Sequence, residues 1–259
     1  MSADAGGSDA VVLRLRGAGC VFAEDEAALL REAAGEDSSR LETLVARRVA
    51  GEPLEVILGW AQFRGLRVAV EAGVFVPRRR TEVLVAQALR YAHGDTVVVE
   101  LCAGVAAVAA ALAAERPHLQ VYAAELDPVA ARVARRNLDP SRVFEGDLYA
   151  ALPAVLRGRV GILIANAPYV PTDEIALMPP EARDHEPALA LDGGADGLDI
   201  QRRVIAGARD WLTPGGVLLI ETSERQAPVS VALMEAVGLS ARAVRDDELD
   251  GTAAVGVAP

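Results

Sequence analysis

Apolar side chains near the start of the chain recur at the spacing of amphipathic helices. In residues 24–34 and 38–49 an apolar position returns every third or fourth residue, which is the period of one helix face. Asp37 or Ser38 stands where the second helix would need an N-terminal cap. Gly51-Glu52-Pro53 then stops the helical pattern. We therefore expect a helical segment that ends near these three residues.

The following stretch favours short strands. Residues 62–70 and 74–76 predict two strands, with Glu71-Ala72-Gly73 between them as a hairpin turn. A helix over residues 81–91 is expected to follow Pro77.

Farther along, short apolar runs alternate with helical patterns. The expected strands are residues 96–101, 120–125, 142–144, 160–165 and 216–221. The expected helices between and after them are residues 105–115, 128–137, 198–211 and 226–237. Such alternation predicts right-handed βαβ units and an α/β fold with a doubly wound, mostly parallel sheet.

The end of the chain does not continue this alternation of strands and helices. Residues 241–244 and 252–257 predict an antiparallel hairpin that closes the sheet, an addition that plain dinucleotide-binding folds usually lack. We therefore divide the chain into a helical N-terminal segment (1–50), a linker with a hairpin (51–80) and a main α/β domain (81–259).

Composition agrees with a buried parallel sheet. Hydrophobic residues make up 52% of the 259 residues and aromatic residues only 4%, so the core is expected to consist of Ala, Val and Leu. The net charge of −11 argues against non-specific binding to a phosphate backbone, which needs a positive footprint. The sequence gives no strong nucleic-acid signal, although a local basic patch remains compatible with it.

The two cysteines and the N-terminal residues indicate in which cellular compartment the protein is expected. Cys20 and Cys102 lie far apart in unlike contexts, which argues against a disulfide framework and favours a reducing compartment. Residues 1–10 lack the basic and apolar regions of a signal peptide. The apolar run 101–114 is shorter than the ~20 residues that cross a bilayer. We expect a cytoplasmic protein without a membrane partner.

Small and acidic residues follow the first strands of the predicted sheet. An open α/β sheet binds ligands at the carboxyl ends of its strands, and the small residues 102–104 would let the backbone approach a ligand closely. Glu125 stands where an acid would bond ribose hydroxyls, and Asp147 follows the third strand, near an adenine position. Alone, a strand–Gly–helix turn is common; together these residues predict a nucleotide-type cofactor. The expected cofactor-binding residues are Glu100, Cys102, Gly104, Glu125, Asp147, Leu148 and Asn166.

The most specific element is Asn166-Ala167-Pro168-Tyr169, directly after the apolar run 160–165. An Asn-x-Pro sequence can simply be a turn that ends a strand. Its place at a strand's carboxyl end, beside the expected cofactor cleft, favours a catalytic function instead.

With these residues in place, the sequence resembles the HemK-type protein-glutamine N5-methyltransferases, which modify a glutamine of peptide-chain release factors, and more broadly the Asn-Pro-Pro-Tyr amino-methyltransferases. The resemblance runs from Gly51 nearly to the end. It rests on Gly51-Glu52-Pro53 with Ile57-Leu58-Gly59, on Val76-Pro77-Arg78-Arg79-Arg80-Thr81-Glu82, on Glu186-Pro187 with residues 190–198, and on Pro214-Gly215-Gly216 with Glu221.

The resemblance implies S-adenosylmethionine as cofactor and a seven-stranded sheet of the class I methyltransferase type. It also implies a protein substrate, a peptide-chain release factor, and a helical N-terminal segment on the substrate side. The catalytic residues would be Asn166, Ala167, Pro168 and Tyr169, and the substrate-binding residues Phe75, Pro77, Arg78, Thr81 and Glu186.

Three departures from the family pattern stand out. Cys102 and Ala106 replace loop glycines, Ala167 replaces the first proline of the catalytic motif, and the N-terminal segment is shorter than the family's usual helical domain. In the family, the Asn side chain and the next residue's backbone carbonyl accept the two amide N–H groups. Replacing proline by alanine keeps that carbonyl, and Pro168 still holds Ala167 extended.

Other chemistries find little support. The three histidines, His93, His118 and His185, lie in unrelated contexts, so we expect no metal and no histidine-activated nucleophile. Residues 78–80 form a basic run that is either a solvated helix start or a contact for an acidic partner. Methylation of an exocyclic amine on RNA or on a small metabolite, and a non-catalytic module, stay open as alternatives.

Overall fold

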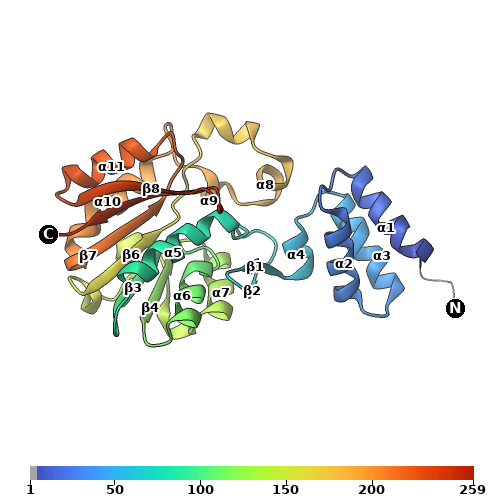
Figure 1. Ribbon diagram of the computed structural model, residues 1–259, viewed down its shortest axis with the longest axis horizontal. Coiled ribbons are helices and arrows are strands. Elements are labelled where there is room, and N and C mark those ends of the chain that lie inside the picture. Colours follow the sequence, from blue (N-terminus) through green and yellow to red (C-terminus); the bar gives the residue numbers. More distant parts are fainter. Residues whose placement is uncertain (1–4) are drawn as a thin grey trace.

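The computed structural model describes residues 5–259 (Figure 1); the first four residues of the expected N-terminal segment lie outside that range. At one end of the molecule, helices α1 (Ala5–Gly17), α2 (Ala23–Ala34) and α3 (Ser38–Val49) pack around their own small apolar core, with α4 (Leu54–Leu58) at its edge. The Asp37 side chain caps α3 by accepting a hydrogen bond from the Arg40 amide at 2.9 Å. The patterns predicted α2 and α3 but not α1.

A small hairpin follows, and it differs from the prediction. Strand β1 (Trp60–Phe63) pairs with β2 (Leu66–Ala69), with Trp60 opposite Ala69. The turn is Arg64-Gly65, with φ of 48° and 78°, since a two-residue hairpin loop favours left-handed backbone. The predicted strand 62–70 is therefore divided by this turn, and the predicted strand at 74–76 was wrong. A turn does lie at Ala72-Gly73, but it joins no pair of strands. Val74 and Val76 are buried all the same, as part of an extended loop.

The main sheet has seven strands in the order β5-β4-β3-β6-β7-β9-β8, as the resemblance implied. Strands β3 to β7 run parallel, and β9 pairs antiparallel with both β7 and β8. The bounds are β3 (Val97–Leu101), β4 (Gln120–Glu125), β5 (Val143–Glu145), β6 (Val160–Ala165), β7 (Leu212–Glu221), β8 (Ser240–Asp246) and β9 (Gly251–Val257). The predicted closing hairpin is confirmed.

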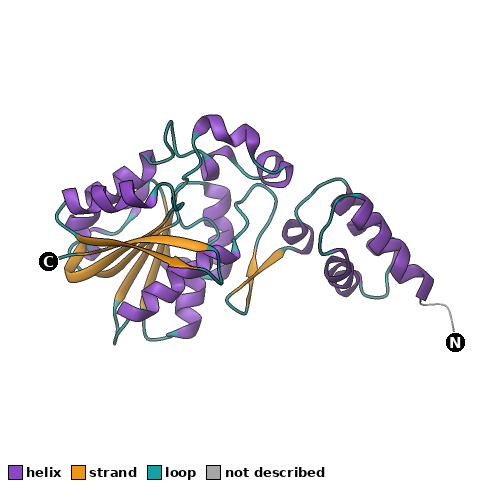
Figure 2. Cartoon of the chain, turned by 45° about the horizontal axis from the view of Figure 1, so that its top comes forward, coloured by secondary structure: helices purple, strands orange, loops and turns teal. Residues whose placement is uncertain are grey.

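Helices cover both faces of this sheet (Figure 2). The long helices are α5 (Glu82–Tyr91), α6 (Ala107–Glu115), α7 (Pro128–Asn137), α10 (Asp199–Trp211) and α11 (Ala227–Ala236). Alternate strand residues point to opposite faces: Ile162 and Ile164 pack in the core with α5, α6 and α7, whereas Leu163 and Ala165 pack in the core with α10. Both cores consist mainly of Ala, Val and Leu, as the composition predicted.

The strand order reverses between β3 and β6, which places a crevice at their carboxyl ends. The long segment between β6 and α10 carries the short helices α8 (Pro180–His185) and α9 (Ala188–Leu191). Among the described residues, no helix is long and apolar enough to span a membrane. The division of the chain at residues 50 and 80 stays a prediction.

Candidate active site

One cavity opens at the carboxyl ends of β3, β4 and β6. Its wall includes every residue that the sequence predicted for the site: Phe75, Pro77, Arg78, Thr81, Glu100, Cys102, Gly104, Glu125, Asp147, Leu148, Asn166, Ala167, Pro168, Tyr169 and Glu186. The fold therefore brings together residues from segments more than a hundred positions apart in the sequence. Their individual roles are proposals, which the contacts below support.

The loop after β3 has an unusual backbone. Gly104 has φ of 54°, and the neighbouring Cys102 and Ala106 have φ of 51° and 60°. This left-handed region suits glycine, whereas a residue with a Cβ costs about 1–2 kcal/mol there. The two replaced glycines thus stand at strained positions, while the loop keeps the turn that faces the cavity.

Glu125 ends β4 beside this loop. Its Oε2 accepts a hydrogen bond from the Gly104 amide at 2.6 Å, and its Oε1 accepts one from the Asp127 amide at 2.8 Å. These two bonds fix the carboxylate, which retains lone pairs for further donors. Burial raises the pKa of Glu125.

Glu100 has a partner in α6. The carboxylate is buried and accepts a hydrogen bond from the Ala109 amide at 2.8 Å. Burial raises the pKa of Glu100 to about 8, with the nearby Glu125 charge acting in the same direction. The carboxyl thus reaches the first turn of α6 while it lines the cavity.

Asp147 and Leu148 follow β5. The Asp147 carboxylate forms a 2.6 Å ion pair with Arg203 of α10, and both side chains are about half exposed. The sequence analysis missed Arg203, because only the packing of α10 against the sheet brings it to Asp147. Leu148 is buried and has φ of 47°.

Asn166 follows β6 and is oriented by Thr81. Its Nδ2 donates a hydrogen bond to the Thr81 Oγ1 at 3.3 Å. Among the described residues, the Asn166 Oδ1 accepts no hydrogen bond, so this acceptor remains available in the cavity wall. Thr81 lines the same cavity and contacts Asn166, and its role in substrate binding stays a prediction.

Tyr169 contacts Glu221, which had no predicted role, and Arg80 of the basic run 78–80. Its hydroxyl donates to the Glu221 Oε1 at 3.2 Å, and the Arg80 guanidinium lies 5.9 Å from the centre of its ring. Burial raises the pKa of Tyr169. Glu221 could have been found from its place at the end of β7, directly beside β6 in the sheet.

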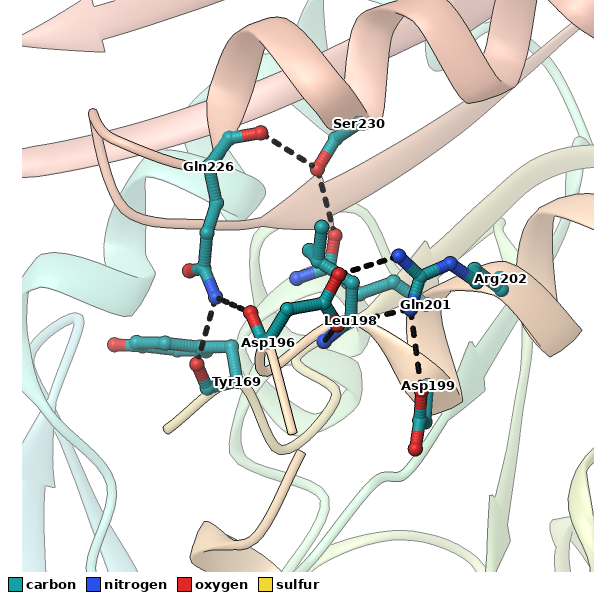
Figure 3. A network of polar contacts seen from close by, with 8 residues as sticks. All are labelled: Tyr169, Asp196, Leu198, Asp199, Gln201, Arg202, Gln226 and Ser230. Carbon is teal, nitrogen blue, oxygen red and sulfur yellow. Dashed lines mark hydrogen bonds and ion pairs between the residues drawn. The ribbon is translucent and has the colours of Figure 1, made fainter. Parts of the chain in front are cut away.

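The backbone of residues 190–198 packs closely against that of residues 168 and 169 (Figure 3). The Gln226 Nε2 donates to the carbonyl oxygens of Tyr169 and Asp196, at 2.9 and 3.0 Å. A Cβ on Gly193 would lie 2.7 Å from the Pro168 oxygen, and one on Gly197 would overlap the Tyr169 oxygen. Only glycine permits this close approach of two backbones.

Glu186 joins the cavity wall to residues 75–78. The Glu186 Oε1 accepts from the Val76 amide at 3.1 Å and from Arg78 at 2.7 Å. The Arg78 guanidinium in turn lies 5.2 Å from the centre of the Phe75 ring. Burial raises the pKa of Glu186, whose Oε2 is buried without a partner.

Similarity to known proteins decides the family. The chain is 45% identical over 189 residues to the release factor glutamine methyltransferase of Streptomyces coelicolor, which covers 71% of this chain and 67% of that protein. It is 39% identical over 207 residues to the same enzyme of Geobacter sulfurreducens, covering 78% and 72%. The chain belongs to the release factor glutamine methyltransferase family.

Two further comparisons concern a relative of different activity and the fold. A 4-amino-L-phenylalanine/4-methylamino-L-phenylalanine methyltransferase of Streptomyces pristinaespiralis is 38% identical over 214 residues, covering 79% of this chain and 73% of that one. A methyltransferase structure from Pyrococcus furiosus shares the fold, with a TM-score of 0.56 at 17% identity over 74% of this chain and 89% of that one. No family model matches the chain.

The cavity suits S-adenosylmethionine, the cofactor of this family. The acidic side chains of Glu100, Glu125, Asp127 and Asp147 line it and offer oxygen acceptors to a polar ligand. Glu125 retains acceptors for a ribose diol, and Leu126 with Leu148 offers apolar surface to a base. Among the side chains that the structure describes, no cluster of His, Cys, Asp and Glu could hold a metal ion.

Proposed function

We propose that this enzyme methylates the side-chain amide nitrogen of a glutamine in a protein, and that its substrate is a peptide-chain release factor. The observation that carries the proposal is the orientation of Asn166. Its Nδ2 is bound by Thr81, which leaves the Oδ1 as an acceptor in the cavity wall. The family membership supports the choice of substrate.

A carboxamide nitrogen is a weak nucleophile because its lone pair is delocalised into the carbonyl. When bound, S-adenosylmethionine would supply the methyl group as an electrophile that its sulfonium already activates. The protein therefore has to orient the amide nitrogen and exclude water. We assign this task to two acceptors, the Asn166 Oδ1 and the backbone carbonyl of Ala167, which is buried in the cavity wall.

Pro168 and Tyr169 complete the arrangement. Pro168 restricts Ala167 to an extended backbone and so keeps its carbonyl aimed. The Tyr169 ring supplies a flat wall against the planar amide, fixed through its hydroxyl by Glu221. On the substrate side, Phe75, Pro77, Arg78 and Glu186 would receive the polypeptide around the glutamine. This assignment rests on their place in the same cavity.

The decisive variant is Asn166→Ala. It removes one acceptor and leaves the Glu125 side of the cavity intact, so affinity for S-adenosylmethionine should hold within a few fold. Methyl transfer should fall by about 10²–10³, the range for deleting one preorganised hydrogen-bonding group. The measurement is transfer of labelled methyl to a purified release factor, with the modified residue located by mass spectrometry.

Three results would refute the proposal: full activity of Asn166→Ala, methylation of a residue other than glutamine, or label that enters only RNA or a small metabolite. Ala167→Pro serves as a control that should retain activity, since the backbone carbonyl is unchanged. We also propose a cytoplasmic location, in keeping with two cysteines that are both free thiols.

A further inference from the structure

Arg48 connects the N-terminal helices to the segment that carries α8. It lies in the last turn of α3, and its side chain is only 11% exposed. Its Nε and Nη2 donate to the two carboxylate oxygens of Glu26 in α2, at 2.6 and 3.3 Å. This two-bond pair fixes the plane of the guanidinium and leaves its Nη1 for other acceptors.

The Nη1 of Arg48 contacts two further acceptors. It donates to the Glu52 carbonyl oxygen at 3.1 Å and lies 3.5 Å from the Glu181 Oε1. Glu52 belongs to the chain that leaves α3, whereas Glu181 lies in α8, more than a hundred residues later. Gly51 also lies beside α8, because a Cβ built on it would be 4.0 Å from the His185 Nε2. Figure 1 shows α8 on the side of the main sheet that faces helices α1 to α4.

Helix α8 has little apolar anchoring of its own. Of its six described residues, Ala182 is the one that is buried, so packing against the core contributes little to its position. The helix stands outside the cavity wall, but Met178 before it and Glu186 after it both line the cavity. The Glu186 amide donates to the Ala182 carbonyl at 3.0 Å, and the Glu186 carboxylate binds residues 76 and 78. Polar contacts therefore hold α8 at its two ends, through Glu186 at the end and Glu181 at the start.

We propose that Arg48 and Glu181 are positioning residues for the protein substrate: their ion pair holds α8, and with it the cavity wall at Met178 and Glu186, in the arrangement that receives the polypeptide. The inference rests on the proposed function, which places Glu186 on the substrate side. A wall that is already in place binds its ligand more tightly, because the ligand does not have to order it. The backbone of Tyr169 is held by separate contacts, so the chemical step should not depend on this ion pair.

The test uses the whole chain with a purified release factor and compares two acids of the same helix. Glu181→Lys should raise the KM for the protein substrate about tenfold, because it places a cation beside Arg48. Glu181→Gln, which only removes the attraction, should raise that KM about two- to fivefold, the scale of a partly exposed ion pair. In both variants kcat and the Kd for S-adenosylmethionine should stay close to the wild-type values. Asp184→Lys is the matched control: it makes the same change of charge in α8, but Asp184 pairs with its neighbour Arg183, so the KM should not change.

Hydrogen exchange gives a second readout, which does not depend on the substrate. The Glu186 amide, which is bonded to Ala182 in α8, should exchange faster in Glu181→Lys than in Asp184→Lys. The reason is that a helix without its anchor opens more often.

The partner residue can be varied in the same way. Arg48→Met should show the same faster exchange and a higher KM, and adding Glu181→Gln to it should raise the KM no further, because the two residues act through one contact. Arg47→Met is the control on α3: Arg47 pairs with Glu52, and its loss should change neither the exchange of α8 nor the KM.

The inference is overturned if Glu181→Lys keeps the wild-type KM, if Asp184→Lys raises the KM as much, or if kcat falls as far as the KM rises. Faster exchange in α8 with an unchanged KM would overturn it too. The two lysine variants decide the matter even if Arg48→Met does not fold. A wild-type enzyme that does not methylate the release factor would instead refute the proposed function. An active wild-type enzyme that Glu181→Lys matches in every constant would refute only the positioning role.

Discussion

Gly197 lies where the backbone of residues 190–198 packs directly against Tyr169. It has φ of 76°, and a Cβ built on it would overlap the carbonyl oxygen of Tyr169 and the Nε2 of Gln226. Gly215 has nearly the same φ, 74°, but no atom lies within 4 Å of its Cβ position. The variants Gly197→Ala and Gly215→Ala therefore share the backbone strain and the change in the unfolded chain. They differ only in crowding at the site.

The expected difference can be worked out from the contacts. To admit the methyl group, the Tyr169 carbonyl or the Gln226 side chain must move, which weakens two hydrogen bonds of about 0.5–1.5 kcal/mol each. Crowding of a packed region adds about 1–3 kcal/mol. Gly197→Ala should thus be less stable than Gly215→Ala by about 2–6 kcal/mol. At about 2–4 °C per kcal/mol for a chain of this size, its Tm should lie roughly 4–24 °C lower.

Activity should separate the two variants further. Displacement of the Tyr169 backbone by a fraction of an ångström misplaces the wall against the substrate amide, so kcat should fall by about 10² in Gly197→Ala. In Gly215→Ala it should stay near the wild-type value. Thermal melts and methyl-transfer rates measure the two effects. If Gly197→Ala matches Gly215→Ala in both, residues 190–198 do not brace the motif.

Two further predictions concern the buried carboxylates of the cofactor side. Glu125→Ala should weaken S-adenosylmethionine binding by about 1–3 kcal/mol in calorimetric titration, the scale for hydrogen bonds to a charged group; unchanged affinity would contradict its role. Folding raises the pKa of Glu100 from a usual value near 4.5 to about 8, so its contribution to stability is complete below pH 4.5 and is lost as the pH rises to about 8. The free energy of unfolding of Glu100→Gln, measured by denaturant titration, should therefore rise relative to that of the wild type between pH 4.5 and pH 8. A difference between the two proteins that does not change with pH would exclude the raised pKa of Glu100.

Periodicity and strand-end position predicted most of the fold. The alternation of apolar runs gave β4, β6 and α7 with the bounds that the structure has, because buried parallel strands and amphipathic helices leave the plainest patterns. Helix α1 was missed, since the analysis of the first residues concerned only their lack of a signal peptide. The hairpin turn was misplaced because Arg64 adopts a positive φ, which sequence patterns associate with Gly or Asn.

The loop after β3 carries two residues with a Cβ where the resemblance to the family leads one to expect glycine. These residues are Cys102 and Ala106, and both have a backbone in the left-handed region. Restoring glycine would relieve about 1–2 kcal/mol of strain at each position, but it would also increase unfolded-state entropy by about 0.5–1 kcal/mol. At Ala106, which is fully buried, it would forfeit about 0.8 kcal/mol of apolar burial as well. The opposing terms nearly cancel there, which explains why the loop tolerates alanine.

The polar contacts of the site were harder to foresee, and their origin differs from case to case. The pair of Asp147 and Arg203 depends on the side on which α10 packs, which no local pattern specifies. The closeness of Glu221 and Asn166 follows instead from strand order alone: β6 and β7 are parallel neighbours, and each of these residues comes directly at the end of its strand. A sequence that predicts adjacent parallel strands therefore also predicts which strand-end residues are neighbours in the sheet, here Asn166 of the proposed reaction and the acid that accepts a hydrogen bond from Tyr169.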